Sequence, residues 1–209
     1  MKTLLFDFDG TIVDSFELGL SIFNNLAHRY NKNDLSDLTI DEIKSMHAIK
    51  VVRHFGIPVY QLPFFVYHAK RDFKKNIIDV KIFPEIKPVL HNLKKKFRIA
   101  ILSSNSEENI SYILKSNDIN IFDFIHSGSS IFGKARSIRA ALRKQKLSLS
   151  EVAYIGDEAR DIDAAKKLGI PIVSVCWGFN SKPLLSSLNP DLIVEDISEL
   201  FDSVSNLLS

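Results

Sequence analysis

Apolar residues along the chain follow two patterns, short continuous runs and helical periodicity. Continuous runs bounded by turn residues are typical of buried strands. They occur at residues 3–9, 99–102, 124–126, 152–155, 170–175 and 192–194. Between them, apolar positions recur at helical spacing and predict helices. These helices are expected at 16–30, 41–55, 60–80, 85–96, 106–116, 134–146, 160–168 and the C-terminal end.

The order of these segments predicts an α/β fold. Strands that alternate with helices form a parallel sheet with right-handed crossovers. An all-helical stretch interrupts this alternation directly after the first strand. We therefore predict a doubly wound parallel sheet, formed by residues 1–14 and 82–209, and an inserted helical cap, formed by residues 15–81. Residues 15–81 are called the cap.

Composition is that of an ordinary globular protein and excludes several classes. The 209 residues carry a net charge of +2, which gives no basic field suited to nucleic acid. No apolar stretch approaches the ~20 residues that span a bilayer, so no membrane partner is expected. The single cysteine, Cys176, and the absence of a signal-peptide pattern predict a cytoplasmic protein.

The candidate chemistry lies where predicted strands end. Ligands of open parallel sheets bind at the carboxyl ends of the strands. The polar residues that follow those ends, or begin the next helix, are Asp7, Asp9, Ser104, Asn105, Lys134, Asp157 and Asp161. They are far apart in sequence but are expected to share one edge of the sheet.

This set suits a metal and a phosphoryl group. Several carboxylates placed together raise each other's pKa, and a hard divalent cation relieves the repulsion. Oxygen ligands without a nearby histidine or cysteine favour Mg²⁺. The donors Ser104, Asn105 and Lys134 suit phosphoryl oxygens.

Each residue alone also has an ordinary structural explanation. Asp9 and Gly10 can form a simple turn, and Asp157 can cap the helix at 160–168. Ser104 can begin a helix with Glu107 in a capping box, and a lysine such as Lys134 can be a surface residue. Taken together, these explanations require separate coincidences at the ends of separate strands.

The motifs resemble those of the haloacid dehalogenase superfamily, and specifically its phosphatases. The segment from Asp7 to Thr11 (Asp-Phe-Asp-Gly-Thr) is similar to the first motif, Ser104 to the second and Lys134 to the third. The segment 156–161 is similar to the fourth. Residues 176–181 and 191–200 resemble the phosphoglycolate phosphatase-like branch, whose Rossmann-like core carries a helical cap.

The resemblance implies a role for each residue. Asp7 would attack phosphorus and form an aspartyl-phosphate, and Asp9 would act as general acid and base. Mg²⁺ would be held by the Asp7 and Asp157 carboxylates and the Asp9 backbone carbonyl, with Asp161 orienting a bound water or Asp157. Ser104 and Lys134 would hold the phosphoryl oxygens.

Other chemistries within the superfamily are separated by particular residues. Dehalogenases lack a second carboxylate like Asp9 and use no metal, so they are disfavoured. Phosphonatases also replace that aspartate and use a cap lysine, for which Lys50 lies in a comparable region. A phosphosugar mutase keeps both aspartates and stays open, as does a catalytically weak regulatory or binding protein.

The substrate is expected to be a small phosphorylated metabolite, with phosphoglycolate as a named possibility. The segment 41–55 carries the basic residues Lys44, His47, Lys50, Arg53 and His54, some of which recur at helical spacing opposite its apolar stripe. A solvated basic face explains this pattern, and so does contact of His47 or Lys50 with the leaving group. Residues Met46-His47 replace a glycine found in many relatives, so the relatives' substrate does not transfer directly. The chain is expected to be a monomer or a homodimer.

Overall fold

A parallel sheet forms the centre of the molecule. The structure is a computed structural model and describes residues 1–127 and 133–208. In these residues the sheet has the strand order β5-β4-β1-β6-β7-β8, and every pair is parallel. The strands are β1 (Thr3–Phe6), β4 (Arg98–Leu102), β5 (Phe124–His126), β6 (Val152–Gly156), β7 (Ile172–Val175) and β8 (Leu192–Val194). The predicted doubly wound α/β fold is confirmed.

Alternate residues of the strands enter two separate cores. Leu4 and Phe6 of β1 belong to one buried cluster, which also contains residues of α5, α6 and α10, while Leu5 belongs to the cluster with α7, α8 and α9. Successive side chains of a strand point to opposite faces, so an uninterrupted apolar run indicates a strand covered on both sides. These helices are α5 (Ile86–Lys94), α6 (Glu107–Ser116), α7 (Lys134–Gln145), α8 (Ala159–Leu168), α9 (Lys182–Ser187) and α10 (Leu200–Leu207).

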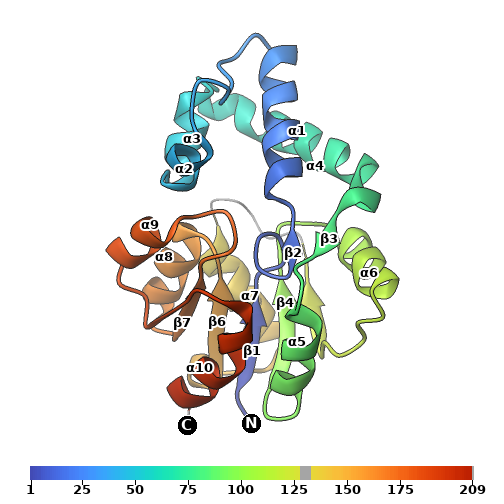
Figure 1. The fold of residues 1–209 in the computed structure, drawn as a ribbon, viewed down its shortest axis with the longest axis vertical. Helices are drawn as coiled ribbons and strands as arrows, with labels where there is room; N and C mark the ends of the chain where they lie inside the picture. The colour runs from blue at the N-terminus through green and yellow to red at the C-terminus, as the bar shows by residue number, and fades with distance from the viewer. Residues whose placement is uncertain (128–132, 209) are drawn as a thin grey trace.

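The cap helices lie beyond the carboxyl ends of the sheet strands, and both chain termini lie at the opposite end (Figure 1). They are α1 (Phe16–Arg29), α2 (Ile40–Lys44), α3 (Ala48–His54) and α4 (Leu62–Lys75), with short 3₁₀ turns at Val59–Gln61 and Ile77–Asp79. Their buried side chains form a third cluster. A short antiparallel pair, β2 (Val13–Asp14) and β3 (Lys81–Ile82), joins the two ends of this segment. The assignment of residues 15–81 to a separate domain stays a prediction.

The single helix predicted over 41–55 is wrong, because the chain forms α2 and α3 with a break between them. Residue His47 has an extended backbone, with ψ of 141°. The side-chain amide of Asn180 donates to the carbonyl oxygens of Lys44 and Met46 at 3.1 Å each, and the Ser181 backbone N–H donates to Lys44 at 2.9 Å. Tertiary hydrogen bonds from Asn180 and Ser181 thus take the carbonyls that a continuous helix would use.

Other predicted elements agree with the structure to within a few residues. Among the elements not predicted are α9, which no apolar periodicity indicated, and the short strands β2 and β3. In the region 60–80, α4 is flanked by two 3₁₀ turns. No helix in the described part of the chain combines the length and apolar character needed to cross a membrane.

Candidate active site

Asp7 lies at the end of the central strand β1 and is almost fully buried, with 3% of its surface exposed. Its backbone N–H continues the sheet by donating to Ile155 at 2.8 Å. The Phe8 backbone N–H donates to Asp7 Oδ1 at 2.8 Å. Gly10 then turns the chain with a φ of +78°, a conformation that a side chain would disfavour. The strand end and this turn therefore hold the Asp7 carboxylate in one orientation.

Lys134 is the side chain that pairs with the Asp7 carboxylate. It begins α7, and its Nζ forms ion pairs with Asp7 Oδ2 and with Asp161 Oδ1. It also lies 5.1 Å from the centre of the Tyr154 ring, a cation–π distance. Burial disfavours the ammonium form, but the carboxylates of Asp161 and Asp7 outweigh burial and raise the pKa of Lys134. A permanent positive charge is thus placed against the carboxylate of Asp7.

Asp7, Asp157 and Asp161 form a buried group of carboxylates. One oxygen of each lies within 4.8 Å of the others. Asp157 is fixed by Thr11, whose Oγ1 donates to Oδ1 at 2.6 Å, and by the Phe179 backbone N–H, which donates to Oδ2 at 2.8 Å. Asp161 Oδ2 accepts from the Glu158 backbone N–H at 3.0 Å.

This group fits a hard divalent cation. Burial, followed by the charges of Glu158 and Asp7, raises the pKa of Asp157 well above its usual range. Burial also raises the pKa of Asp161 to about 6, although Lys134 opposes the shift. A bound cation would relieve this repulsion, and ligands that are all oxygen suit Mg²⁺. The Asp9 side chain is not a member of the group, and its predicted contribution is its backbone carbonyl oxygen.

Asp9 lies in a different environment, beside neutral donors. Ser15 Oγ and Ser103 Oγ donate to its two carboxylate oxygens at 3.3 Å, and Asn105 Nδ2 lies 3.4 Å from both. Burial, and then the charge of Asp7, raises the pKa of Asp9 to about 6. A carboxyl group with this pKa can both hold and release a proton near neutral pH, as general acid–base chemistry requires.

The two predicted donors after β4 lie close to Asp9 but differ in their contacts. Asn105 contacts Asp9 directly, and its Oδ1 accepts from Ser106 N at 2.9 Å and Asn109 Nδ2 at 2.8 Å. Ser104 is half-buried and lines the same cavity as Asp9. Its hydroxyl is therefore accessible to a ligand.

Sequence reasoning missed several residues of this site. Ser103 and Ser15 bind Asp9, and Thr11 binds Asp157. Thr11 was part of the first motif, which offered a signal, whereas nothing distinguished the buried Ser103 from its neighbour. Glu158 and Arg160, which form an ion pair facing the cavity, lie inside the fourth motif but received no role.

His47 and Lys50 are the two cap residues predicted to contact substrate. Neither is among the described residues that line the cavity beside Asp9. His47 Nε2 lies 2.9 Å from Asp163 Oδ2, so it connects the cap to α8. Lys50 is exposed on α3. Their roles in substrate binding stay predictions. Near His47, Lys44 Nζ donates to the Gly178 carbonyl at 2.9 Å, which adds to the contacts between these two parts of the chain.

Comparison with known proteins gives the class of this fold and site. Residues 4–175 match the family model of the haloacid dehalogenase-like hydrolases. The chain belongs to this family, and the predicted resemblance is confirmed. It is thus an enzyme, a hydrolase in a family whose named relatives here are phosphatases.

Particular relatives cover the whole chain. A phosphoglycolate phosphatase from Synechococcus elongatus is 29% identical over 210 residues, covering 100% of this chain and 99% of the relative. A pyrophosphatase PpaX from Oceanobacillus iheyensis is 21% identical, and the match covers 99% of this chain and 98% of the relative. The crystal structure of a predicted phosphatase from Clostridium acetobutylicum has a TM-score of 0.83 at 22% identity and covers 98% of both chains. That structural likeness supports the fold.

Proposed function

We propose that the chain is a Mg²⁺-dependent phosphatase that hydrolyses a small phosphate monoester through an aspartyl-phosphate on Asp7. The observation that carries this proposal is the pairing of two carboxylates with different surroundings. The Asp7 carboxylate forms an ion pair with Lys134, while Asp9 lies among neutral donors and burial raises its pKa to about 6. Two neighbouring carboxyl groups with divergent environments suit a nucleophile and an acid–base catalyst.

Each step of the reaction then has a group on this chain. An Asp7 carboxylate oxygen forms a bond to phosphorus while the bond from phosphorus to the ester oxygen breaks. Asp9 donates its proton to that oxygen as the alcohol leaves. Asp9 then takes a proton from water, which attacks phosphorus and breaks the bond to Asp7, releasing inorganic phosphate and restoring the enzyme.

The remaining polar residues orient the reactants and balance their charge. Lys134 would donate to a phosphoryl oxygen beside Asp7, and the Ser104 hydroxyl would donate to another phosphoryl oxygen. Asp7, Asp157 and the Asp9 carbonyl would hold Mg²⁺, with Asp161 as an orienting group. The bound cation would offset the negative charge that builds up around the phosphoryl group.

The name of the phosphoglycolate phosphatase relative supports a small organic phosphate as substrate, with phosphoglycolate as one candidate, whereas the name of the PpaX relative points to pyrophosphate. The cytoplasmic location and the monomeric or homodimeric state stay predictions. A phosphosugar mutase would need a bisphosphate activator and would return an isomerised sugar phosphate. A regulatory or binding protein on this fold would bind ligands without turning them over.

Hydrolysis of p-nitrophenyl phosphate tests the proposal. We expect activity that requires added Mg²⁺, is lost on chelation and returns when Mg²⁺ is restored. Asp7→Asn should abolish turnover, whereas Asp14→Asn, the same change at an exposed position of β2, should retain it. Full activity of Asp7→Asn, or no activity of the wild type on any ester, would refute the proposal.

A further inference from the structure

A cavity of about 260 Å³ lies between the cap and the sheet domain. This is close to the lower end of the size range of small-molecule pockets, roughly 300 Å³. Polar residues gather at one part of its wall, where Asp9, Ser104 and Asn105 lie. The proposed proton donor to the leaving oxygen therefore faces this cavity, and the organic part of a substrate would occupy it.

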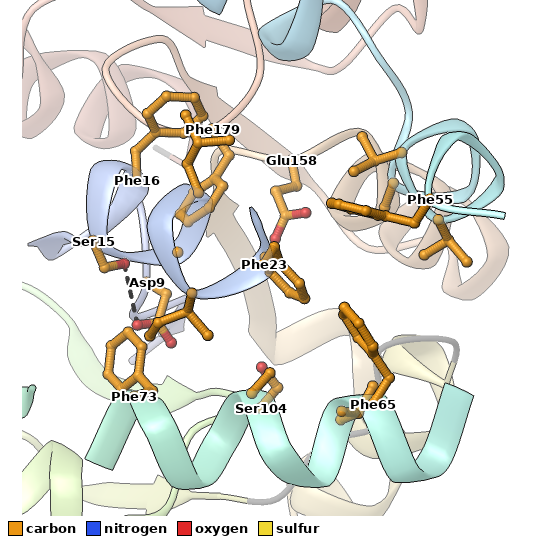
Figure 2. A pocket seen from close by; sticks show the side chains of 18 of the residues that line it. Asp9, Ser15, Phe16, Phe23, Phe55, Phe65, Phe73, Ser104, Glu158 and Phe179 are labelled. Carbon is orange, nitrogen blue, oxygen red and sulfur yellow. Dashed lines mark hydrogen bonds between the residues drawn. The ribbon is translucent and has the colours of Figure 1, made fainter. Parts of the chain in front are cut away.

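Most of the cavity wall away from Asp9 is apolar and strongly aromatic (Figure 2). The phenylalanines that line it are Phe16, Phe23, Phe55, Phe65, Phe73 and Phe179. Aliphatic side chains of α1, α3 and α4 complete the wall. A ligand that filled this space would exchange water for apolar surface.

The aromatic side chains form two groups, and the rings within each group pack against one another. Phe23 is stacked on Phe65 with ring centres 5.9 Å apart, and Phe55 lies 6.0 Å from each of them. Phe16 and Phe179 meet edge to face at 5.5 Å. Phe55 and Phe65 lie across the cavity from Asp9 (Figure 2). These mutual contacts hold the rings in place, so the wall is largely formed before a ligand binds.

The charged groups that reach the cavity in the described residues do not offer a free buried cation for a second anionic group. Arg160 is paired with Glu158, and its Nε donates to Glu158 Oε1 at 2.8 Å. Lys70 lines the cavity but is exposed to solvent. A leaving group that carries a carboxylate, such as glycolate, would bury that charge against phenylalanine rings, at a considerable cost.

We propose that this site selects phosphate monoesters whose organic group is apolar, either aromatic or aliphatic, over esters of polar or acidic alcohols. This inference rests on the proposed phosphatase function and names the class of its substrate. The phosphoryl group would lie at Asp7, the ester oxygen at Asp9 and the apolar group among Phe23, Phe55 and Phe65. Closure by the cap residues around Lys44 and Met46, which Asn180 binds, would exclude water from it.

A homologous series of substrates tests the inference on the wild-type enzyme. The series runs from methyl phosphate through propyl to hexyl phosphate, with phenyl phosphate, glycerol 3-phosphate and phosphoglycolate for comparison. Each buried methylene is worth about 0.8 kcal/mol, so kcat/KM should rise roughly fourfold per methylene over the first members. Phenyl phosphate should exceed phosphoglycolate by at least about tenfold. A flat or falling alkyl series, or a preference for phosphoglycolate, would overturn the inference.

A pair of variants on α4 places the selectivity in the cavity. Val66 lines the cavity, while its neighbour Tyr67 is 64% exposed and does not. Val66→Trp should lower kcat/KM for hexyl and phenyl phosphate at least about tenfold and change that for methyl phosphate by less than about threefold. Tyr67→Trp should leave the whole profile unchanged. If Val66→Trp does not fold, Val66→Phe replaces it, and equal effects on all esters would contradict the inference.

The outcomes separate failure of this inference from failure of the proposed function. If the wild type hydrolyses none of these esters with Mg²⁺ present, the phosphatase function itself fails. If it hydrolyses them in an Asp7-dependent manner but prefers glycerol 3-phosphate or phosphoglycolate, only the assignment of an apolar leaving group fails.

Discussion

Gly178→Ala is expected to impair the metal site although Gly178 is not itself a ligand. Gly178 belongs to the loop that follows β7 and packs directly against Asp157. A β-carbon at this position would lie under 3.0 Å from Asp157 Oδ2, from Asp157 Cγ and from the carbonyl oxygen of Gly10, a separation that real β-carbons essentially never show. Two of these atoms belong to a proposed metal ligand, so the substitution acts on the site directly.

The size of the effect follows from how far these atoms must move. Ordinary contact with a β-carbon begins at 3.4 Å, so the Asp157 carboxylate or the loop must shift by roughly 1 Å. A misplacement of that size can lower catalysis by about 10²-fold. A shift of the loop would also weaken the 2.8 Å hydrogen bond from Phe179 N to Asp157. The overpacking itself should cost about 1–3 kcal/mol of folding free energy.

A Mg²⁺ titration of p-nitrophenyl phosphate hydrolysis measures this effect. We expect Gly178→Ala to need more Mg²⁺ for half-maximal activity and to lose about 10²-fold in kcat/KM at a fixed subsaturating concentration of the metal. Gly19→Ala is the control for added volume beside the same cavity, because a β-carbon there lies 3.6 Å from the Phe179 ring, at ordinary contact distance, and not near Asp157. Gly19 is inside α1, where alanine is favoured over glycine by about 0.5–1 kcal/mol, so this variant should be at least as stable as the wild type.

The reasoning is refuted if Gly178→Ala binds Mg²⁺ and turns over substrate as the wild type does. It is also refuted if both variants lose activity equally, since the loss would then not depend on contact with Asp157. Calorimetry of Mg²⁺ binding to the folded variant separates a damaged metal site from a general loss of stability.

Three further predictions concern charged residues of the site and its surroundings. Lys134→Met leaves buried carboxylates without their cation and should destabilise the metal-free protein by about 3–5 kcal/mol. Lys182→Met, at an exposed ion pair, should change the stability little, and urea denaturation compares the two variants. The pKa of Asp9 is raised in the folded protein from 3.8 to about 6, so the folded state binds the proton more tightly and loses stability as the pH rises through this window. In the presence of a chelator, the free energy of unfolding of Asp9→Asn should therefore rise relative to that of the wild type as the pH increases from about 4 to about 6. A difference between the two free energies that does not change with pH would contradict the raised pKa. His47→Ala should change kcat/KM only a few-fold and show a coupling energy of about 0.2–1 kcal/mol with Asp163→Ala in a double-mutant cycle of stability, since Asp163 is mostly exposed. A large rise in KM that does not depend on Asp163 would instead support the predicted contact of His47 with substrate.

The parallel sheet was predictable because its signals are local. Parallel strands covered on both faces appear as continuous apolar runs, and the residues 152–155 were recognised in this way. The polar residues after each strand followed from the rule that the carboxyl ends of parallel strands meet at one edge. The structure brings Asp7, Asp157 and Asp161 within 4.8 Å of one another, as that rule predicts for neighbouring strand ends.

The cap was harder to predict because its details depend on contacts with distant segments. The break between α2 and α3 depends on Asn180, which lies more than a hundred residues further along the chain. The charge pattern of 41–55 indicated a basic face, but it could not show that His47 pairs with Asp163. The apolar cavity requires phenylalanines from different helices to converge, such as Phe23 of α1 and Phe65 of α4. Each has the spacing of an ordinary core residue, so no sequence pattern separated a cavity from a filled core.

Trapping of the covalent intermediate tests the central claim most directly. The enzyme is mixed with Mg²⁺ and phenyl phosphate, quenched with acid within the first turnover and reduced with borohydride, which converts a phosphorylated aspartate to homoserine. Mass spectrometry of the N-terminal peptide should find homoserine at residue 7, with none at Asp9 and none in a sample without substrate. Hydrolysis of phenyl phosphate with an unmodified Asp7 at every quench time, or modification of another carboxylate, would contradict the account.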